Sequence, residues 1–337
     1  MNSFDGKWEV CSLETISKLT GADYFFGKKL NEKLNVPIGL IDISYVLATI
    51  ATFLDKTTVL HTKDTSAIFS FKRQRHKEFL KQNINWEENG YQGKRPAYNP
   101  QHFPTLCFNG MVNPIIPFSC KIIVWYQDES EALSQISEQY VTWFGDYISM
   151  MRKKFKNPEL PIYYVQLAGF EFPQDTTSIS WAKFRISQEE CLKYKNIGMA
   201  TAVDIGINNN IHPVNKQEIG RRLALITLNK TYGFSDIIYQ GPHISSIETK
   251  SKKLILTFDH TYGGLVSKSK GNTVTGFSAE LNNGEILQLT GKITSKNTIQ
   301  ISVSNLKSIR YAYANYPDCN LYNNANLPAL PFTKSIY

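Results

Sequence analysis

The sequence predicts an α/β fold, in which a three-layer domain with a parallel sheet is followed by a small antiparallel β-sandwich domain. Up to about residue 234, short continuous apolar runs alternate with segments of helical periodicity. Beyond that point, short runs alternate apolar with polar residues. Continuous runs are typical of parallel strands covered on both faces, whereas alternation is typical of antiparallel strands with one solvated face.

The first part of the chain predicts buried strands connected by helices. Residues Ala22, Phe25, Phe26, Leu30 and Leu34 follow one another at mostly helical steps. This alternation favours a parallel sheet with helices on both faces. The strands are predicted at 37–43, 121–126, 161–167 and 199–203, and the helices around 22–34, 133–155 and 215–230.

A polar segment at 55–105 interrupts this pattern. Its periodicity is weak apart from a predicted helix around 72–84. We interpret it as a surface insertion between two sheet strands, which either shapes a binding site or has a structural role only.

The last hundred residues predict short antiparallel strands. Asn282-Asn283-Gly284 is a turn signal between two of them. We therefore predict two domains, 1–234 and 235–337, the second a β-sandwich. Its strands are expected at 254–258, 273–277, 299–303 and 309–313.

Composition excludes several classes of protein. The 337 residues are 42% hydrophobic and 12% aromatic, so the chain is not disordered. The net charge of +8 comes partly from basic runs at 72–75 and 250–253, but no nucleic-acid motif accompanies them, and we predict no nucleic-acid partner. No run of 18 apolar residues occurs and no apolar segment follows Met1, so neither a membrane span nor a signal peptide is predicted.

The five cysteines are scattered and form no C-x-x-C pair. This spacing argues against a zinc site, and the expected state is buried thiols with at most one disulfide. We predict neither a metal nor a cofactor.

Two polar stretches at predicted strand ends are candidates for chemistry. His212 follows the fourth strand and precedes a helix, where it can act as a general base or simply bond to the local backbone. Gln127 and Glu129 follow the second strand of this group. Gln127 can donate to an oxyanion, and Glu129 can favour the helix N-terminus. Asp204 is the candidate carboxylate for orienting His212.

Several motifs resemble the sialate O-acetylesterase family. Asp23–Leu30 with Val36–Ile41 resembles its first-helix and second-strand segment, and Phe108–Pro114 with Trp125–Gln127 resembles the next landmark. Ile211–Ala224 resembles the catalytic-histidine block. The β-rich tail is similar at 309–315, 319–323 and 327–332.

This resemblance implies an SGNH-type hydrolase domain followed by a β domain. It implies hydrolysis of acetyl esters on sugars, 9-O-acetylated sialic acids above all, through a Ser–His pair and an acyl-enzyme. His212 is then the catalytic base, Gln127 an oxyanion donor and Asp204 a candidate orienter, with an O-acetylated sugar as partner. Family members work in secreted, periplasmic or lysosomal settings.

The sequence also departs from the family pattern. The family's Gly-Gln-Ser-Asn-Met nucleophile block has no counterpart, so we expect an N-terminally incomplete chain whose sheet lacks its first strand. Val46-Leu47-Ala48 stands where the family has Gly-Gly-Thr. Asp128 replaces a Gly, where a carboxylate would oppose a nearby oxyanion, and Asn208–Asn210 replaces a turn that commonly carries Asp.

These departures leave two functions open. One is a sialate O-acetylesterase-type hydrolase. The other is a catalytically inactive fragment or remnant, at most a sugar-binding or scaffold protein, because loss of a serine nucleophile alone lowers the rate about a millionfold.

Overall fold

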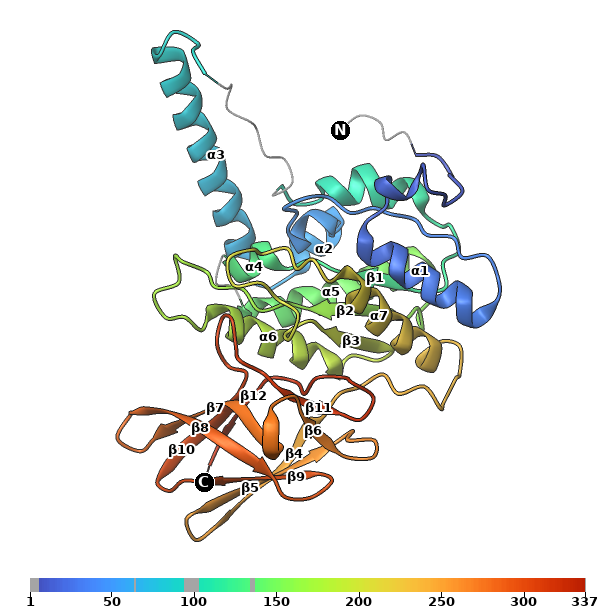
Figure 1. Ribbon diagram of the computed structural model, residues 1–337. Coiled ribbons are helices and arrows are strands. Elements are labelled where there is room, and N and C mark those ends of the chain that lie inside the picture. The colour runs from blue at the N-terminus through green and yellow to red at the C-terminus, as the bar shows by residue number, and fades with distance from the viewer. Residues whose placement is uncertain (1–5, 64, 94–102, 134–136, 337) are drawn as a thin grey trace.

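A computed structural model describes residues 6–63, 65–93, 103–133 and 137–336. Figure 1 shows a region of helices packed on a short parallel sheet, with a separate antiparallel β region below it. The segment between Lys230 and His243 joins the two regions, and the predicted boundary at 234/235 falls within it.

The parallel sheet consists of β1 (Ile123–Trp125), β2 (Ile162–Gln166) and β3 (Ile197–Thr201), hydrogen-bonded in that order. Both pairings are parallel. Every residue of β2 and β3 is buried, which is why these strands read as continuous apolar runs. The structure thus confirms three of the four strands predicted for this sheet.

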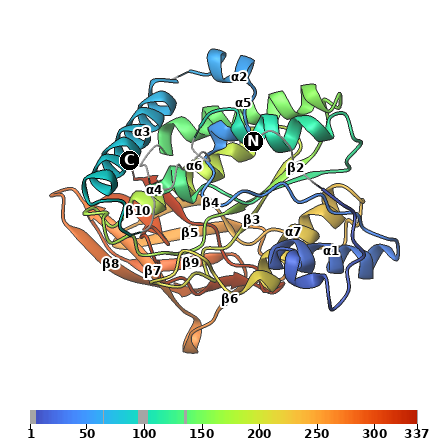
Figure 2. The same cartoon turned by 90° about the horizontal axis from the view of Figure 1, so that it is seen from above.

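Helices cover both faces of the sheet (Figure 2). On one face, α1 (Gly21–Leu34) packs against α7 (Lys216–Lys230). A side chain at Gly220 would lie 2.6 Å from the backbone nitrogen of Phe26, so glycine there lets the two helices approach closely. On the other face lie α5 (Ser137–Lys154) and α6 (Ser180–Glu190), whose buried side chains join a second core. The three predicted layers are therefore present.

The prediction of a strand at 37–43 was wrong. Its side chains divide between the two cores, because Ile38 and Leu40 pack on the α1/α7 side and Ile43 on the other. The backbone, however, is not paired with any strand of the described residues. The continuous apolar run predicted a buried strand, but residues 37–43 are exposed or half-buried, and a run of apolar residues carries no information about a hydrogen-bonding neighbour.

The insertion at 55–105 is more helical than the sequence indicated. It contains α2 (Lys56–His61) and α3 (Thr65–Glu88), the latter extending beyond the predicted 72–84. Figure 1 shows α3 projecting away from the rest of the molecule. The remaining short helices are Ile16–Lys18, Ile50–Phe53, the π-helical turn Phe108–Val112, Asn113–Ile115, α4 (Glu129–Leu133), Cys191–Lys193 and Lys270–Asn272.

The C-terminal region is antiparallel, as predicted, but its strands form one continuous seven-stranded sheet and a two-stranded ribbon. Register shifts in three of its strand pairs bend the sheet, so that one face encloses its own core. The sheet has the order β12 (Phe332–Ser335), β10 (Leu306–Tyr311), β7 (Thr273–Leu281), β8 (Ile286–Ile293), β9 (Thr298–Ser302), β5 (Lys253–Asp259) and β4 (His243–Lys250), and the ribbon joins β11 (Leu321–Asn323) to β6 (Leu265–Ser267).

All five cysteines are free thiols, of which Cys107 and Cys191 are buried. No helix within the described ranges is both long and apolar enough to cross a bilayer.

Candidate active site

His212 lies in the loop between β3 and α7, at the edge of the sheet where the strands end. The residue is exposed, and its backbone N–H donates to Asn210 Oδ1 at 2.9 Å. The helix that follows is capped by Asn215, whose Oδ1 accepts from the Glu218 N–H at 3.1 Å. The loop backbone is therefore held at both ends, while the imidazole faces solvent.

Glu129, Lys216 and Tyr126 complete a polar cluster with His212. Lys216 Nζ donates to the Tyr126 hydroxyl at 3.2 Å and lies 4.8 Å from the centre of its ring. Burial raises the pKa of Glu129, and the charges of Lys216 and His212 act in the opposite direction. The sequence indicated Glu129 only as a residue at a helix start, and the structure adds its burial and the nearby charge of Lys216.

Gln127 also lies at this edge, but its amide is already engaged. Its Nε2 donates to the Ala48 carbonyl at 2.5 Å and to Glu131 Oε2 at 2.7 Å. Both amide hydrogens are thereby used, and one of these bonds must break before Gln127 can donate to an oxyanion. Its Oε1 is buried and has no partner among the described residues.

Glu131 is a fully buried carboxyl beneath the site. It accepts the Ile50 N–H at 2.6 Å as well as the Gln127 bond. Burial raises its pKa to about 7, because these donors offset only part of the cost of removing the charge from water. Glu131 thus ties Gln127 to the segment that begins at Ile50.

Asp128 does not oppose the site, contrary to the prediction. Its carboxylate is fully buried and accepts from Trp125 Nε1, Tyr140 Oη and Gln188 Nε2 at 2.9, 2.7 and 2.7 Å. Burial, with the neighbouring charge of Glu131, raises the pKa of Asp128 well above its ordinary value. Its φ of 113° lies in the region that favours glycine, and the three side-chain bonds hold it there.

The turn at 46–48 presents carbonyl groups towards the start of α4. Ser130 Oγ donates to the Leu47 carbonyl at 3.2 Å, and the Ala48 carbonyl accepts from Gln127. The Ala48 N–H is turned back to the Tyr45 carbonyl at 3.2 Å. Through the two carbonyl bonds, the turn holds Gln127 and the start of α4 in place.

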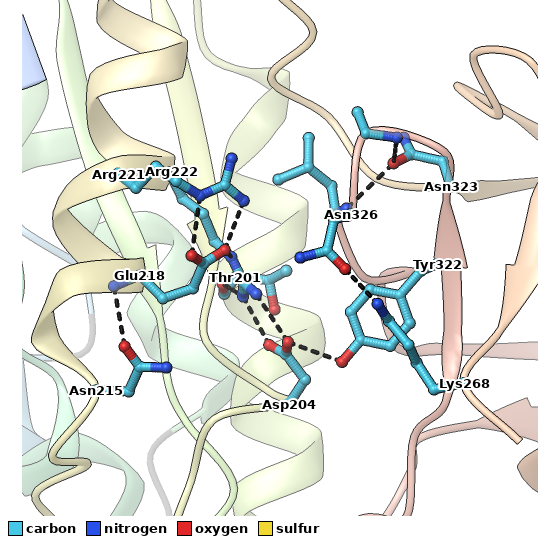
Figure 3. A network of polar contacts seen from close by, with 12 residues as sticks. Thr201, Asp204, Asn215, Glu218, Arg221, Arg222, Lys268, Tyr322, Asn323 and Asn326 are labelled. Atoms are coloured by element: carbon cyan, nitrogen blue, oxygen red, sulfur yellow. Dashed lines mark hydrogen bonds and ion pairs between the residues drawn. The ribbon is translucent and has the colours of Figure 1, made fainter.

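Asp204 lies at the boundary with the antiparallel region, as Figure 3 shows. Arg222 forms a two-pronged ion pair with it at 2.6 and 2.7 Å, and both side chains are 4% exposed. The Tyr322 hydroxyl of β11 donates to the same carboxylate at 3.0 Å. The orientation of His212 by Asp204 stays a prediction, and the contacts in the structure give this carboxylate a role in joining the two regions.

Distant partners explain what the sequence missed. Glu131 and Asp128 draw their donors from Ile50, Tyr140 and Gln188, and no local pattern indicates such contacts. The signal that was present for Glu129 is its position directly after a strand end, beside Gln127. Across the described residues, no three His, Cys, Asp or Glu side chains are arranged to hold a metal ion.

Comparisons with known proteins agree with this architecture. A family model described as "Carbohydrate esterase, sialic acid-specific acetylesterase" matches residues 108–229, which include Gln127 and His212. The crystal structure of a novel carbohydrate acetylesterase from Xanthomonas citri aligns with a TM-score of 0.82 at 27% identity, over 99% of this chain and 69% of that one. Both comparisons are with carbohydrate esterases.

Within that class, the curated relatives are sialate O-acetylesterases. The protein of Rattus norvegicus is 23% identical over 93% of this chain, and that of Homo sapiens is 25% identical over 68% of it. This chain is therefore similar to the sialate O-acetylesterases, through the family model at 108–229 and through these curated relatives. It spans 63% of the length of the rat protein.

Proposed function

We propose that the protein hydrolyses acetyl esters on sialic acid or related sugars at the site around His212. The observation that carries this proposal is the exposed position of His212 in the loop after β3, within the segment that matches the family model. An exposed histidine beside a partly buried carboxylate is an arrangement suited to moving a proton at the surface of a sugar.

In this proposal, the nucleophile is the serine that the family resemblance implies, although the Gly-Gln-Ser-Asn-Met block itself has no counterpart in the sequence given. Its hydroxyl attacks the acetyl carbonyl carbon, and His212 takes the hydroxyl proton. The imidazolium then gives that proton to the departing sugar oxygen, and water releases acetate from the acyl-enzyme by the same route. Glu129 stabilises the imidazolium electrostatically, because its carboxylate carries the opposite charge in a partly buried position. Gln127 donates to the oxyanion after releasing one of its two present bonds.

A second candidate function is sugar binding without turnover. It is favoured by the engaged state of Gln127 and by the carbonyl groups that the 46–48 turn presents. Among the described residues, the only hydrogen bond of His212 is the one from its backbone to Asn210. Under this alternative, the cluster recognises the hydroxyl groups of a sugar, and acetate is not released.

We further propose that the sheet corresponds to an SGNH-type sheet without its first strand. Two observations support this. Within the described residues, β1 is paired on one side only, by β2. The segment 37–43 places Ile38 and Leu40 in the same core as Val124, and Ile43 in the same core as Trp125.

The test is release of acetate from a 9-O-acetylated sialic acid by the purified protein. We expect His212→Ala to lower turnover at least about a hundredfold, the usual effect of losing a general base. His61→Ala is the matched control, because His61 is exposed and its ring nitrogen contacts the Thr57 carbonyl of its own helix.

Equal turnover by the native protein and His212→Ala would contradict the proposal. If neither releases acetate, a binding isotherm with the same sugar decides whether the second candidate holds.

A further inference from the structure

A pocket lies between the parallel sheet and the antiparallel region, along the edge of β3 that β2 leaves open. Its cavity volume is about 80 Å³, and it opens to solvent on one side. One wall is β3 itself, and the opposite wall is apolar, formed by Leu327, Pro328 and Leu330. This edge of the sheet is the one opposite β1. None of His212, Glu129 and Lys216 lines the pocket.

The backbone of β3 offers an unused donor and acceptor to this pocket. Successive residues of a strand point their backbone groups to opposite edges. The carbonyls of Ile197 and Thr201 face the open edge, where they accept from Lys230 Nζ and Arg222 Nη1. Met199, midway between them, therefore turns its N–H and C=O to the same edge, and no partner for either is found among the described residues.

The charge of the pocket lining is one-sided. Its ionisable side chains include Arg222, Lys230, His243 and His260, and no carboxylate of the described residues lines it. Arg222 is balanced by Asp204, and His243 contacts Glu189 at 2.6 Å. Lys230 has no carboxylate partner among the described residues, and burial lowers its pKa.

A strained loop forms part of the rim. His260 has a φ of 56° and Tyr262 a φ of 40°, both in the region that favours glycine. The ring of His260 contacts the Tyr262 hydroxyl at 3.3 Å. Backbone strain of this kind concentrates at ligand sites, where the surrounding structure maintains it.

We propose that this pocket binds a small organic carboxylate, with the anion against Lys230 Nζ and the Met199 N–H and an apolar part against Leu327, Pro328 and Leu330. A single negative charge fits best, because Lys230 is the one lysine or arginine of the described lining that has no carboxylate partner. The apolar wall favours a ligand with a hydrocarbon or N-acetyl face.

The experiment is calorimetric titration of the full chain at low salt with two acids, N-acetylneuraminic acid and benzoic acid. The methyl ester of each acid is the uncharged match. We expect at least one acid to bind and its ester to bind at least about tenfold more weakly, because one charge-assisted hydrogen bond is lost. The proposal is overturned if neither acid binds at millimolar concentration, or if acid and ester bind equally.

Variants locate the binding. Lys230→Met is expected to weaken binding of the acid at least about tenfold, with Lys183→Met, an exposed lysine that does not line the pocket, as the matched control. His212→Ala is expected to leave binding unchanged. Loss of binding in His212→Ala, with native affinity in Lys230→Met, assigns the ligand to the other site and overturns the proposal whether or not the protein hydrolyses esters.

Discussion

His212 and Asp204 come from the same loop after β3, yet the structure uses them in different ways. His212 is exposed, and its described hydrogen bond comes from the backbone. Asp204 is buried, paired with Arg222 and bonded to Tyr322 of the antiparallel region. The difference teaches that closeness in sequence does not give two side chains the same environment. Burial and bonding give Asp204 a structural role, while its orientation of His212 stays a prediction.

The largest expected effect on stability is that of replacing Asp204. Asp204→Ala leaves the Arg222 guanidinium buried without its main counter-charge, and we expect the free energy of unfolding to fall by about 3–5 kcal/mol. Urea denaturation measures this loss. Asp236→Ala, at an exposed carboxylate, should change the stability by no more than about 0.5 kcal/mol. If the two substitutions lower the free energy of unfolding by similar amounts, Asp204 does not have the structural role given to it here.

A second test uses pH and the buried Glu131. Its pKa of about 7 in the folded protein, against 4.5 ordinarily, means that the folded chain binds the proton more tightly. Its contribution to stability is complete below about pH 4.5 and is lost as the pH rises to about 7, by at most about 3 kcal/mol. Glu131→Gln should remove this part of the pH dependence.

The measurement for Glu131 is the free energy of unfolding by urea at several values between pH 5 and pH 8. Glu138→Gln, at an exposed glutamate, serves as the control and should keep the native slope. If Glu131→Gln retains the native pH dependence, the buried carboxyl is not its source.

A smaller effect is expected at the start of α7, which follows the His212 loop. Asn215→Ala removes the cap on the Glu218 N–H and should cost about 1 kcal/mol. Thermal unfolding measures it, with exposed Asn209→Ala in the same loop as the control. A loss no larger than that of the control would show that the loop does not depend on this cap.

The predictable parts of the fold are those in which the buried positions form a local pattern of apolar residues in the sequence. The strands β2 and β3 are buried at every position, and α1 and α7 bury one face, so their periodicities were visible in the sequence. The segment 37–43 also packs both ways, but strand formation needs a hydrogen-bonding neighbour, which no periodicity reports.

The candidate site was predictable only in part for the same reason. His212 and Gln127 were found because chain order places both at strand ends. The engagement of Gln127 by Ala48 and Glu131, and of Asp128 by Tyr140 and Gln188, depends on segments far away in sequence. Contacts of that range decide which polar groups are free, and they become visible only in the folded chain.

The most direct test of the account is to measure acetate release and urea unfolding on the same preparation of His212→Ala. We predict a loss of turnover of at least about a hundredfold, with the free energy of unfolding within about 0.5 kcal/mol of the native protein. A fall in stability comparable to that of Asp204→Ala, or turnover equal to the native protein, would contradict the assignment of His212 to chemistry.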